Sequence, residues 1–146
     1  TFINICTGPN YVSQAAAYNP SAISPLIMIA SDLDYRDVSS KLPSSWVSSG
    51  IELTQLVVCI NNQEAILLET CKYDGPDVKR YQHKYKVTVY QAMTGEILGR
   101  ETFLGTEPRE CSEKENYDLR MLDGGIDFDP IIEWLCQYVD PACASQ

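Results

Sequence analysis

Six widely spaced cysteines constrain this chain more than any other feature. No two of them form a C-x-x-C pair, and His83 is the single histidine, so a Cys2His2 zinc site is excluded. An even number of distant cysteines is typical of three disulfides in an oxidising compartment. The alternative is a set of reduced, buried thiols in a cytosolic protein. We expect a secreted, extracellular or cell-surface protein stabilised by disulfides that involve Cys6, Cys59, Cys71, Cys111, Cys136 and Cys143.

Length and charge narrow the class of protein further. A chain of 146 residues is long enough for one domain with a hydrophobic core. It has no apolar run of about 18 residues, so we expect no membrane insertion. Its net charge of -9 repels phosphates, which argues against a nucleic acid partner.

Alternating and apolar runs predict a β-rich fold. The clearest is the stretch from Arg80 to Gln91, in which apolar and polar side chains alternate with the period of a strand. Asn61-Asn62 and Thr94-Gly95 are turn signals between neighbouring strands. We predict an α+β, mostly β fold, with an antiparallel meander of four to five strands at about 26–30, 51–60, 64–72, 80–91 and 96–103.

A C-terminal helix is expected to cover this sheet. Asp129 is a candidate N-cap, and Pro130 suits the first helical position. Apolar residues with helical spacing follow, so we predict a helix at about 130–139 that packs on one sheet face.

The N-terminal segment, 1–25, differs from the rest of the chain because it carries no charged side chain. A solvated tail is normally charged, so we expect residues 1–25 to form an arm docked on its own domain or on a neighbouring subunit. Residues 26–146 then form a single disulfide-bonded, β-rich domain.

Catalytic and metal-binding patterns are weak. The chain lacks G-x-S-x-G and the glycine-rich phosphate loops, and its one histidine lies within a predicted strand, so we expect no enzyme activity and no cofactor. Asp123, Asp127 and Asp129 flank or follow Gly124-Gly125 and form a candidate weak Ca²⁺ site. The alternative is a solvated acidic loop.

Aromatic side chains offer a second kind of site. Trp46 lies in a polar stretch, and Tyr81, Tyr85 and Tyr90 lie in the alternating strand. They form either part of the core or a platform for a carbohydrate or protein ligand.

A set of ordered motifs gives the chain a recognisable pattern. Its members are Tyr18-Asn19-Pro20, Leu42-Pro43-Ser44-Ser45-Trp46, Leu56-Val57-Val58-Cys59, Glu69-Thr70-Cys71-Lys72-Tyr73, Arg80-Tyr81, Ala92-Met93-Thr94-Gly95-Glu96, Phe103-Leu104-Gly105 and Pro108-Arg109-Glu110-Cys111. Over about residues 18–139 the chain resembles a group of uncharacterised, Cys-containing, β-rich domains in predicted secreted or membrane-anchored microbial proteins. That group has no assigned activity, so the resemblance implies an extracytoplasmic module and carries over no functional residue.

The disulfide pairing is predicted from the expected packing. Six cysteines allow fifteen pairings, and sequence alone does not choose among them. Because the helix should cover the sheet, we predict Cys59–Cys136, with Cys71–Cys111 and a bridge Cys6–Cys143 that ties the two chain ends. An alternative for Cys6 or Cys143 is a bridge to another subunit.

These features favour a non-enzymatic extracellular structural or interaction module. One concrete form is a self-assembling subunit of a filament or surface layer, in which Phe2, Ile3 and Ile5 of the arm add to the sheet edge of a neighbouring copy. Opposite charge clusters at residues 72–86 and 107–129 are compatible with such an assembly. The alternative is a secreted domain that binds a glycan or small molecule.

Overall fold

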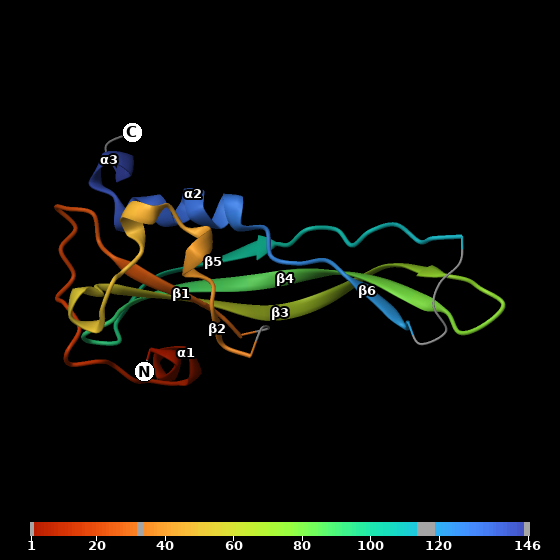
Figure 1. Ribbon diagram of the computed structural model, residues 1–146, viewed down its shortest axis with the longest axis horizontal. Helices are drawn as coiled ribbons and strands as arrows, with labels where there is room; N and C mark the ends of the chain where they lie inside the picture. Colours follow the sequence, from red (N-terminus) through yellow and green to blue (C-terminus); the bar gives the residue numbers. More distant parts are fainter. Residues whose placement is uncertain (1, 32–33, 114–118, 145–146) are drawn as a thin grey trace.

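In the computed structural model, a mixed sheet runs along the length of the molecule, and helices α1 (Ile3–Thr7) and α2 (Phe128–Val139) pack on it (Figure 1). The structure describes residues 2–31, 34–113 and 119–144. The strands in these residues are β1 (Leu26–Ala30), β2 (Arg36–Asp37), β3 (Leu56–Cys71), β4 (Val78–Gln91), β5 (Ile97–Leu104) and β6 (Met121–Asp123). The helices are α1 (Ile3–Thr7), α2 (Phe128–Val139) and α3 (Pro141–Ala144), with short 3-10 turns at Ser39–Lys41, Ser44–Trp46 and Ile51–Leu53. The α+β, mostly β fold class is confirmed.

The strand order is β2-β1-β3-β4-β5, and β6 pairs with β4 beyond the end of β5. The β3–β4 and β4–β5 pairs are antiparallel, as predicted. The β1–β3 pair is parallel, so the sheet is mixed and not a simple meander. The connection from β1 to β3 contains β2 and the three 3-10 turns, which is long enough for the chain to return to the same end of the sheet.

The predicted turn at Asn61-Asn62 is wrong. Residues 51–60 and 64–72 do not form two strands: 51–53 is a 3-10 turn, and β3 continues from Leu56 to Cys71. The strand passes through the asparagines without a turn. Its pairing with β4 shifts register between Asn62 and Glu64, and again between Leu67 and Glu69. Such bulges let a long strand bend without breaking its pairing.

The predicted turn at Thr94-Gly95 is confirmed. Gly95 has a φ of 75°, which is a conformation that glycine adopts without strain, and its amide donates to the Gln91 carbonyl oxygen. A side chain at Gly95 would also collide with the Asn10 backbone, so this turn is where the N-terminal segment crosses the hairpin.

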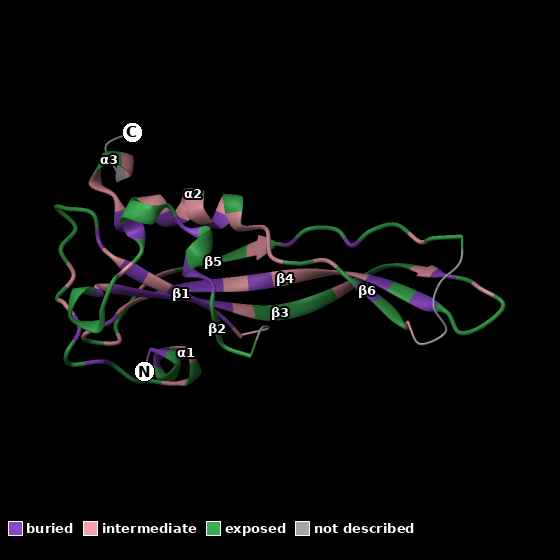
Figure 2. Ribbon diagram, in the orientation of Figure 1, coloured by how far each residue is buried: buried purple, intermediate pink, exposed green. Residues whose placement is uncertain are grey.

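Two hydrophobic clusters cover the two faces of the sheet around its centre. On one face the inner residues of α2, Ile131, Leu135 and Val139, pack on β1, β3 and β4. Trp46 folds into the same cluster and is 5% exposed. On the other face α1 and residues 12–15 pack on Val57 and Cys59 of β3. Figure 2 shows this buried centre in purple, within the rounded part of the molecule that we call the body.

Helix α2 begins at Phe128, two residues earlier than predicted, so Asp129 lies in its first turn instead of capping it. Asp127 occupies the N-cap position, without a side-chain hydrogen bond to the helix. The apolar stripe is as predicted, and the helix ends before Pro141, which starts α3.

Three disulfides are present, Cys6–Cys59, Cys71–Cys111 and Cys136–Cys143, and every cysteine is paired. The prediction of Cys71–Cys111 is confirmed. The predicted bridges Cys59–Cys136 and Cys6–Cys143 are wrong, because Cys59 points to the sheet face covered by α1, whereas α2 covers the opposite face. Multiple disulfides indicate an oxidising environment. Among the described helices, none has the length and apolar character needed to cross a membrane.

Candidate functional site

A narrow extension of the sheet projects from the body (Figure 1). We call it the blade: residues 61–71 of β3, residues 78–84 of β4, strand β6 and the crossing segment 105–112. In Figure 2 the blade is mostly exposed, unlike the body. Within the described residues, no strand pairs with β3 on the side away from β4 beyond Ile60. The blade is therefore a thin layer whose two faces can be compared.

One face of the blade is covered by the crossing segment. After β5 the chain leaves the sheet at Gly105, which accepts a hydrogen bond from the Gln82 side chain, and runs across the hairpin to Cys111. The Cys71–Cys111 disulfide ties this segment to the end of β3. Beneath it Cys71 and Val78 form a small hydrophobic cluster with Leu122 of β6.

Arg80 fastens the crossing segment a second time. Its Nε donates to the Arg109 carbonyl oxygen at 2.9 Å and its Nη2 to the Pro108 carbonyl oxygen at 2.8 Å. Its Nη1 donates to Glu69 Oε1 at 2.6 Å, across the hairpin. Arg80 is 8% exposed, so these contacts satisfy a cation that is largely removed from water. A charge-assisted contact of this kind is stronger than a neutral hydrogen bond.

The other face of the blade, which we call the open face, has no covering segment among the described residues. Side chains directly opposite one another in a sheet share a face, and the register places Leu67, Tyr81 and Asp123 in one row. Thr70, Lys79 and Met121 form the next row toward the tip. Leu67 is 49% exposed and Met121 is 52% exposed. The open face thus presents large apolar side chains to solvent.

Asn62, His83 and Asp123 form a chain of hydrogen bonds where the blade joins the body. His83 Nε2 lies 2.7 Å from Asp123 Oδ1, and His83 Nδ1 lies 2.9 Å from the Asn62 amide nitrogen. Both ring nitrogens are therefore engaged, and the amide nitrogen of asparagine is a donor only, so Nδ1 accepts. This arrangement connects β3, β4 and β6 and gives each ring nitrogen a partner within the protein.

A groove lies on the body between α1 and the β1–β2 edge of the sheet, and we call it the α1 groove. Its volume is about 240 Å³, and it is lined by Phe2, Ile3, Ile27, Ile29, Tyr35 and Asp37. The wall made by α1 is fixed covalently by Cys6–Cys59. Ile3 and Tyr35 are exposed at the groove, and Asp37 is the carboxylate among its described lining residues.

The arm residues form part of this groove. The structure places Ile3 to Thr7 in helix α1, with Phe2 and Ile5 buried against the body's own sheet. Ile3 is the exposed member of the predicted arm site. Residues 3–5 are therefore helical, and Phe2 and Ile5 are packed within their own chain.

The structure does not bring the predicted aromatic platform together. Trp46 and Tyr85 are buried in the cluster under α2, whereas Tyr90 packs on the opposite face of the sheet with α1. Tyr81 lies on the blade, in the row of Leu67. These four side chains present no common surface.

The candidate Ca²⁺ ligands are also separated. Asp123 is hydrogen-bonded to His83, Asp127 lies at the N-cap of α2, and Asp129 lies in its first turn. No cluster of possible metal ligands in the described residues contains them. Asp118, which belongs to the same acidic stretch, lies outside the described residues.

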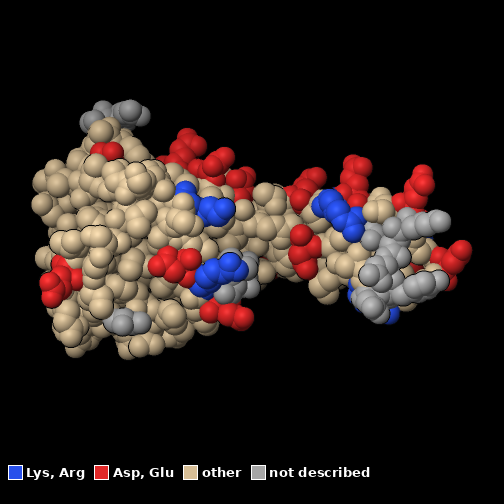
Figure 3. All heavy atoms as spheres, in the orientation of Figure 1, with Lys and Arg blue, Asp and Glu red and all other residues tan. Residues whose placement is uncertain are grey.

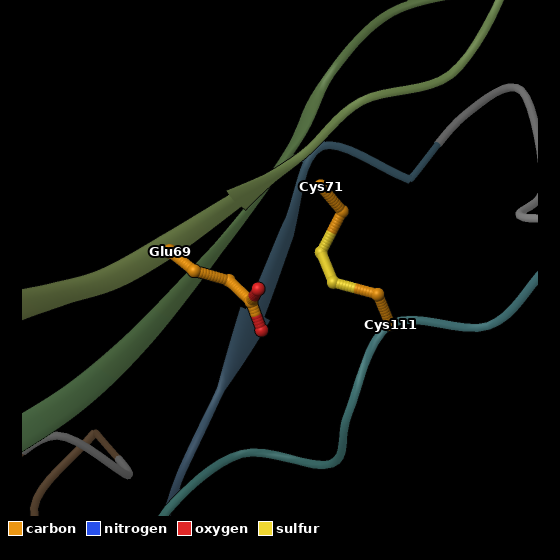
Figure 4. Close-up of side chains that lie close together, drawn as sticks. All are labelled: Glu69, Cys71 and Cys111. Carbon is orange, nitrogen blue, oxygen red and sulfur yellow. A yellow bond between two sulfur atoms is a disulfide. The ribbon is translucent and has the colours of Figure 1, made fainter.

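Two clusters with metal-ligand chemistry contain disulfides instead. Glu69, Cys71 and Cys111 gather on the covered face of the blade, where Glu69 and Cys71 project from β3 toward the crossing segment (Figure 4). Cys136, Asp140 and Cys143 gather at the end of α2. Because each cysteine sulfur is bonded to another sulfur, neither cluster offers a thiolate as a metal ligand.

Charged side chains gather along the blade. Acidic groups follow one edge of the molecule in Figure 3, with few basic groups among them. Two members of the basic stretch form ion pairs: Lys72 pairs with Asp77 at 2.8 Å in the turn between β3 and β4, and Arg80 pairs with Glu69 within the blade. Lys79 makes no ion pair with a described residue and is exposed beside Met121.

The sequence reasoning missed both the open face and the α1 groove. The run Ile66-Leu67-Leu68 signals a strand with large apolar side chains, but it does not tell which of its faces stays uncovered. Comparisons with family models, with curated proteins and with solved structures gave no match.

Proposed function

We propose that this chain is a non-enzymatic structural module of an oxidising extracytoplasmic environment, which assembles with copies of itself through the open face of the blade. The observation that carries the proposal is the pair of exposed apolar side chains in neighbouring rows of that face, Leu67 and Met121. Exposed apolar side chains that are surrounded by polar residues often mark a surface for protein–protein contact.

The rigidity of the blade supports this role. The crossing segment, the Cys71–Cys111 disulfide and the Arg80 contacts all lie on the covered face, so they hold the hairpin without occupying the open face. A surface that is already ordered loses little conformational freedom on binding, which favours association.

The contact is placed on the blade and not on the arm. Strand addition by residues 2–5 requires an extended segment, and α1 is helical, with Phe2 and Ile5 in its own core. The nearby Cys6–Cys59 bridge limits how far this segment can leave the body. An arm that left this site to add to a neighbour's sheet edge would therefore uncover the apolar surface on which Phe2 and Ile5 now pack.

The non-enzymatic part of the proposal is supported by the state of the one histidine. Asn62 and Asp123 occupy both nitrogens of His83, and the cysteines are oxidised. Two kinds of group that nucleophilic catalysis often uses, a histidine base and a cysteine thiol, are thus both engaged in structural contacts.

The proposal is tested by light scattering over a concentration series in buffer of near-physiological ionic strength, where long-range repulsion between acidic copies is screened. We expect the molar mass of the unmodified chain to rise with concentration above the 16.4 kDa of one copy. The double variant Leu67→Lys/Met121→Lys should stay at the mass of one copy, because lysines on the open face make burial of that face unfavourable.

A matched control separates the open face from general hydrophobicity. Leu53 and Leu104 are 56% and 52% exposed but lie outside the open face, so Leu53→Lys/Leu104→Lys should assemble like the unmodified chain. Circular dichroism verifies that both double variants are folded. A single-copy mass for the unmodified chain at every concentration would exclude the proposed assembly.

A further inference from the structure

We infer that the open face of one copy docks into the α1 groove of a second copy, so that the contact is head-to-tail. This inference rests on the proposed function and adds the second half of the interface. Such a contact is heterologous, because two different surfaces meet. In a row of copies, the first copy then has an unoccupied groove and the last copy an unoccupied open face, or the reverse.

The α1 groove has the size and chemistry to accept an apolar side chain. Its volume of about 240 Å³ exceeds the roughly 150 Å³ of an apolar cavity that admits benzene. Phe2, Ile3, Ile27 and Ile29 supply apolar walls. A leucine or methionine side chain that enters this groove exchanges water for apolar contacts with these walls.

The charge beside Met121 on the open face is complementary to that of the groove. Lys79 lies beside Met121, and Asp37 is the carboxylate among the described residues that line the groove. Neither makes an ion pair with a described residue of its own chain, although Asp37 Oδ1 accepts a hydrogen bond from the Ser39 amide. The other charge in these rows of the open face, Asp123, is already paired with the single histidine. An apolar anchor flanked by a cation thus faces an apolar recess flanked by an anion. Charge complementarity of this kind sets the register of a contact.

The two surfaces belong to separate parts of the molecule. The groove is on the body beside α1 and β2, and the open face is on the blade that extends away from it (Figure 1). Because disulfides hold both α1 and the covered face of the blade in place, the two surfaces cannot fold onto each other within one chain. They can meet only between copies, and a repeat of that contact generates an open filament unless it closes into a ring.

The experiment mixes two variants that each lack one surface. Leu67→Lys/Met121→Lys removes the open face, and Ile3→Asp places a charge in the groove wall. Each variant alone should remain at the mass of one copy, 16.4 kDa, by light scattering. An equimolar mixture should give a species of twice that mass, because the intact groove of the first variant accepts the intact blade of the second, and neither can extend the chain further.

Two controls test whether the effect of Ile3→Asp comes from the groove itself. Ile23 is 40% exposed, like Ile3, but does not line the groove, so Ile23→Asp should assemble like the unmodified chain. Peptide mapping without reductant verifies that the Cys6–Cys59 bridge forms in Ile3→Asp and that α1 is held in place.

Two results would overturn the head-to-tail contact while leaving self-assembly intact. If Ile3→Asp alone assembles like the unmodified chain, the blade contacts another blade or a surface outside the groove. If both variants are monomers and their mixture is also monomeric, while the unmodified chain assembles, the two surfaces are not partners. A monomeric unmodified chain would instead exclude the proposed function itself.

Discussion

The body and the blade are built from the same two strands but are stabilised in different ways. In the body, β3 and β4 are covered on both faces, by α2 on one and by α1 on the other. In the blade the described residues cover them on one face, with a segment that lacks regular structure. The body therefore depends on burial of apolar surface, whereas the blade depends on one disulfide, one buried arginine and a small cluster. The two strands thus stay paired beyond the hydrophobic core, in a region where a disulfide and the contacts of a buried arginine take over the stabilising role of the core.

The largest expected effect comes from removing the Cys71–Cys111 disulfide with Cys71→Ser/Cys111→Ser. The bridge joins residues 40 apart, for which the chain-entropy model gives about 4 kcal/mol. We expect the blade to open locally, so that amides of residues 64–70 exchange with solvent much faster, while the amides of β1 and α2 stay protected. Hydrogen exchange measured by mass spectrometry resolves the two regions.

The control for this prediction is Cys136→Ser/Cys143→Ser at the end of α2. That bridge joins residues 7 apart, for which the same model gives about 2 kcal/mol, and it should leave exchange in the blade unchanged. Equal loss of protection in blade and body after removal of Cys71–Cys111 would mean that the two regions unfold as one unit.

The next effect tests the body. Leu135 is fully buried under the sheet, so Leu135→Ala should lower the free energy of unfolding by about 3 kcal/mol and affect all of the molecule. Leu122→Ala makes the same change in the small cluster of the blade, where fewer neighbours surround the side chain. Urea denaturation should show a clearly smaller loss for Leu122→Ala, and similar losses would contradict a difference in core packing between the regions.

The smallest effect concerns Tyr18, which joins the N-terminal segment to α2 on the body. Its hydroxyl donates to the Tyr138 carbonyl oxygen at 2.7 Å. Burial, with a further contribution from Tyr138, raises the pKa of Tyr18 above its ordinary value of 10.0. The folded state therefore favours the neutral phenol. Its contribution to stability is complete below the pKa of the unfolded chain and is lost as the pH rises through the higher folded value.

Tyr18→Phe removes both the hydrogen bond and this pH dependence. We expect a loss of about 1 kcal/mol at neutral pH, and a smaller decrease in stability between about pH 9 and 11 than in the unmodified chain. Urea denaturation at several pH values measures both. An identical alkaline decrease in the two proteins would show that Tyr18 does not contribute to it.

The sequence predicts those parts of the fold that depend on residues close together in the chain. The alternation in β4, the turn at Gly95 and the apolar stripe of α2 depend on near neighbours in the sequence, and each is present. The continuous β3 was not predictable from the Asn61-Asn62 signal, because an exposed strand tolerates asparagine where a bulge relieves the register.

Distant contacts were not predictable from the sequence. The parallel β1–β3 pairing and the Cys6–Cys59 bridge both depend on which sheet face each segment reaches after a long connection. The same limit applies to the candidate site. The alternation places Tyr81 and Tyr85 on one face, but only the packing reveals that α2 covers Tyr85 and that the face bearing Tyr81 and Leu67 remains open.

The length of the β3–β4 hairpin has a mechanical consequence. The 16 residues of β3 span about 50 Å along the long axis of the molecule. Tension applied between the blade and the body acts parallel to the strands, whereas the hydrogen bonds to β1 and β5 lie across them. Those bonds are then loaded in shear and share the force at the same time, instead of opening one after another. A string of such molecules would resist stretching better than it resists peeling.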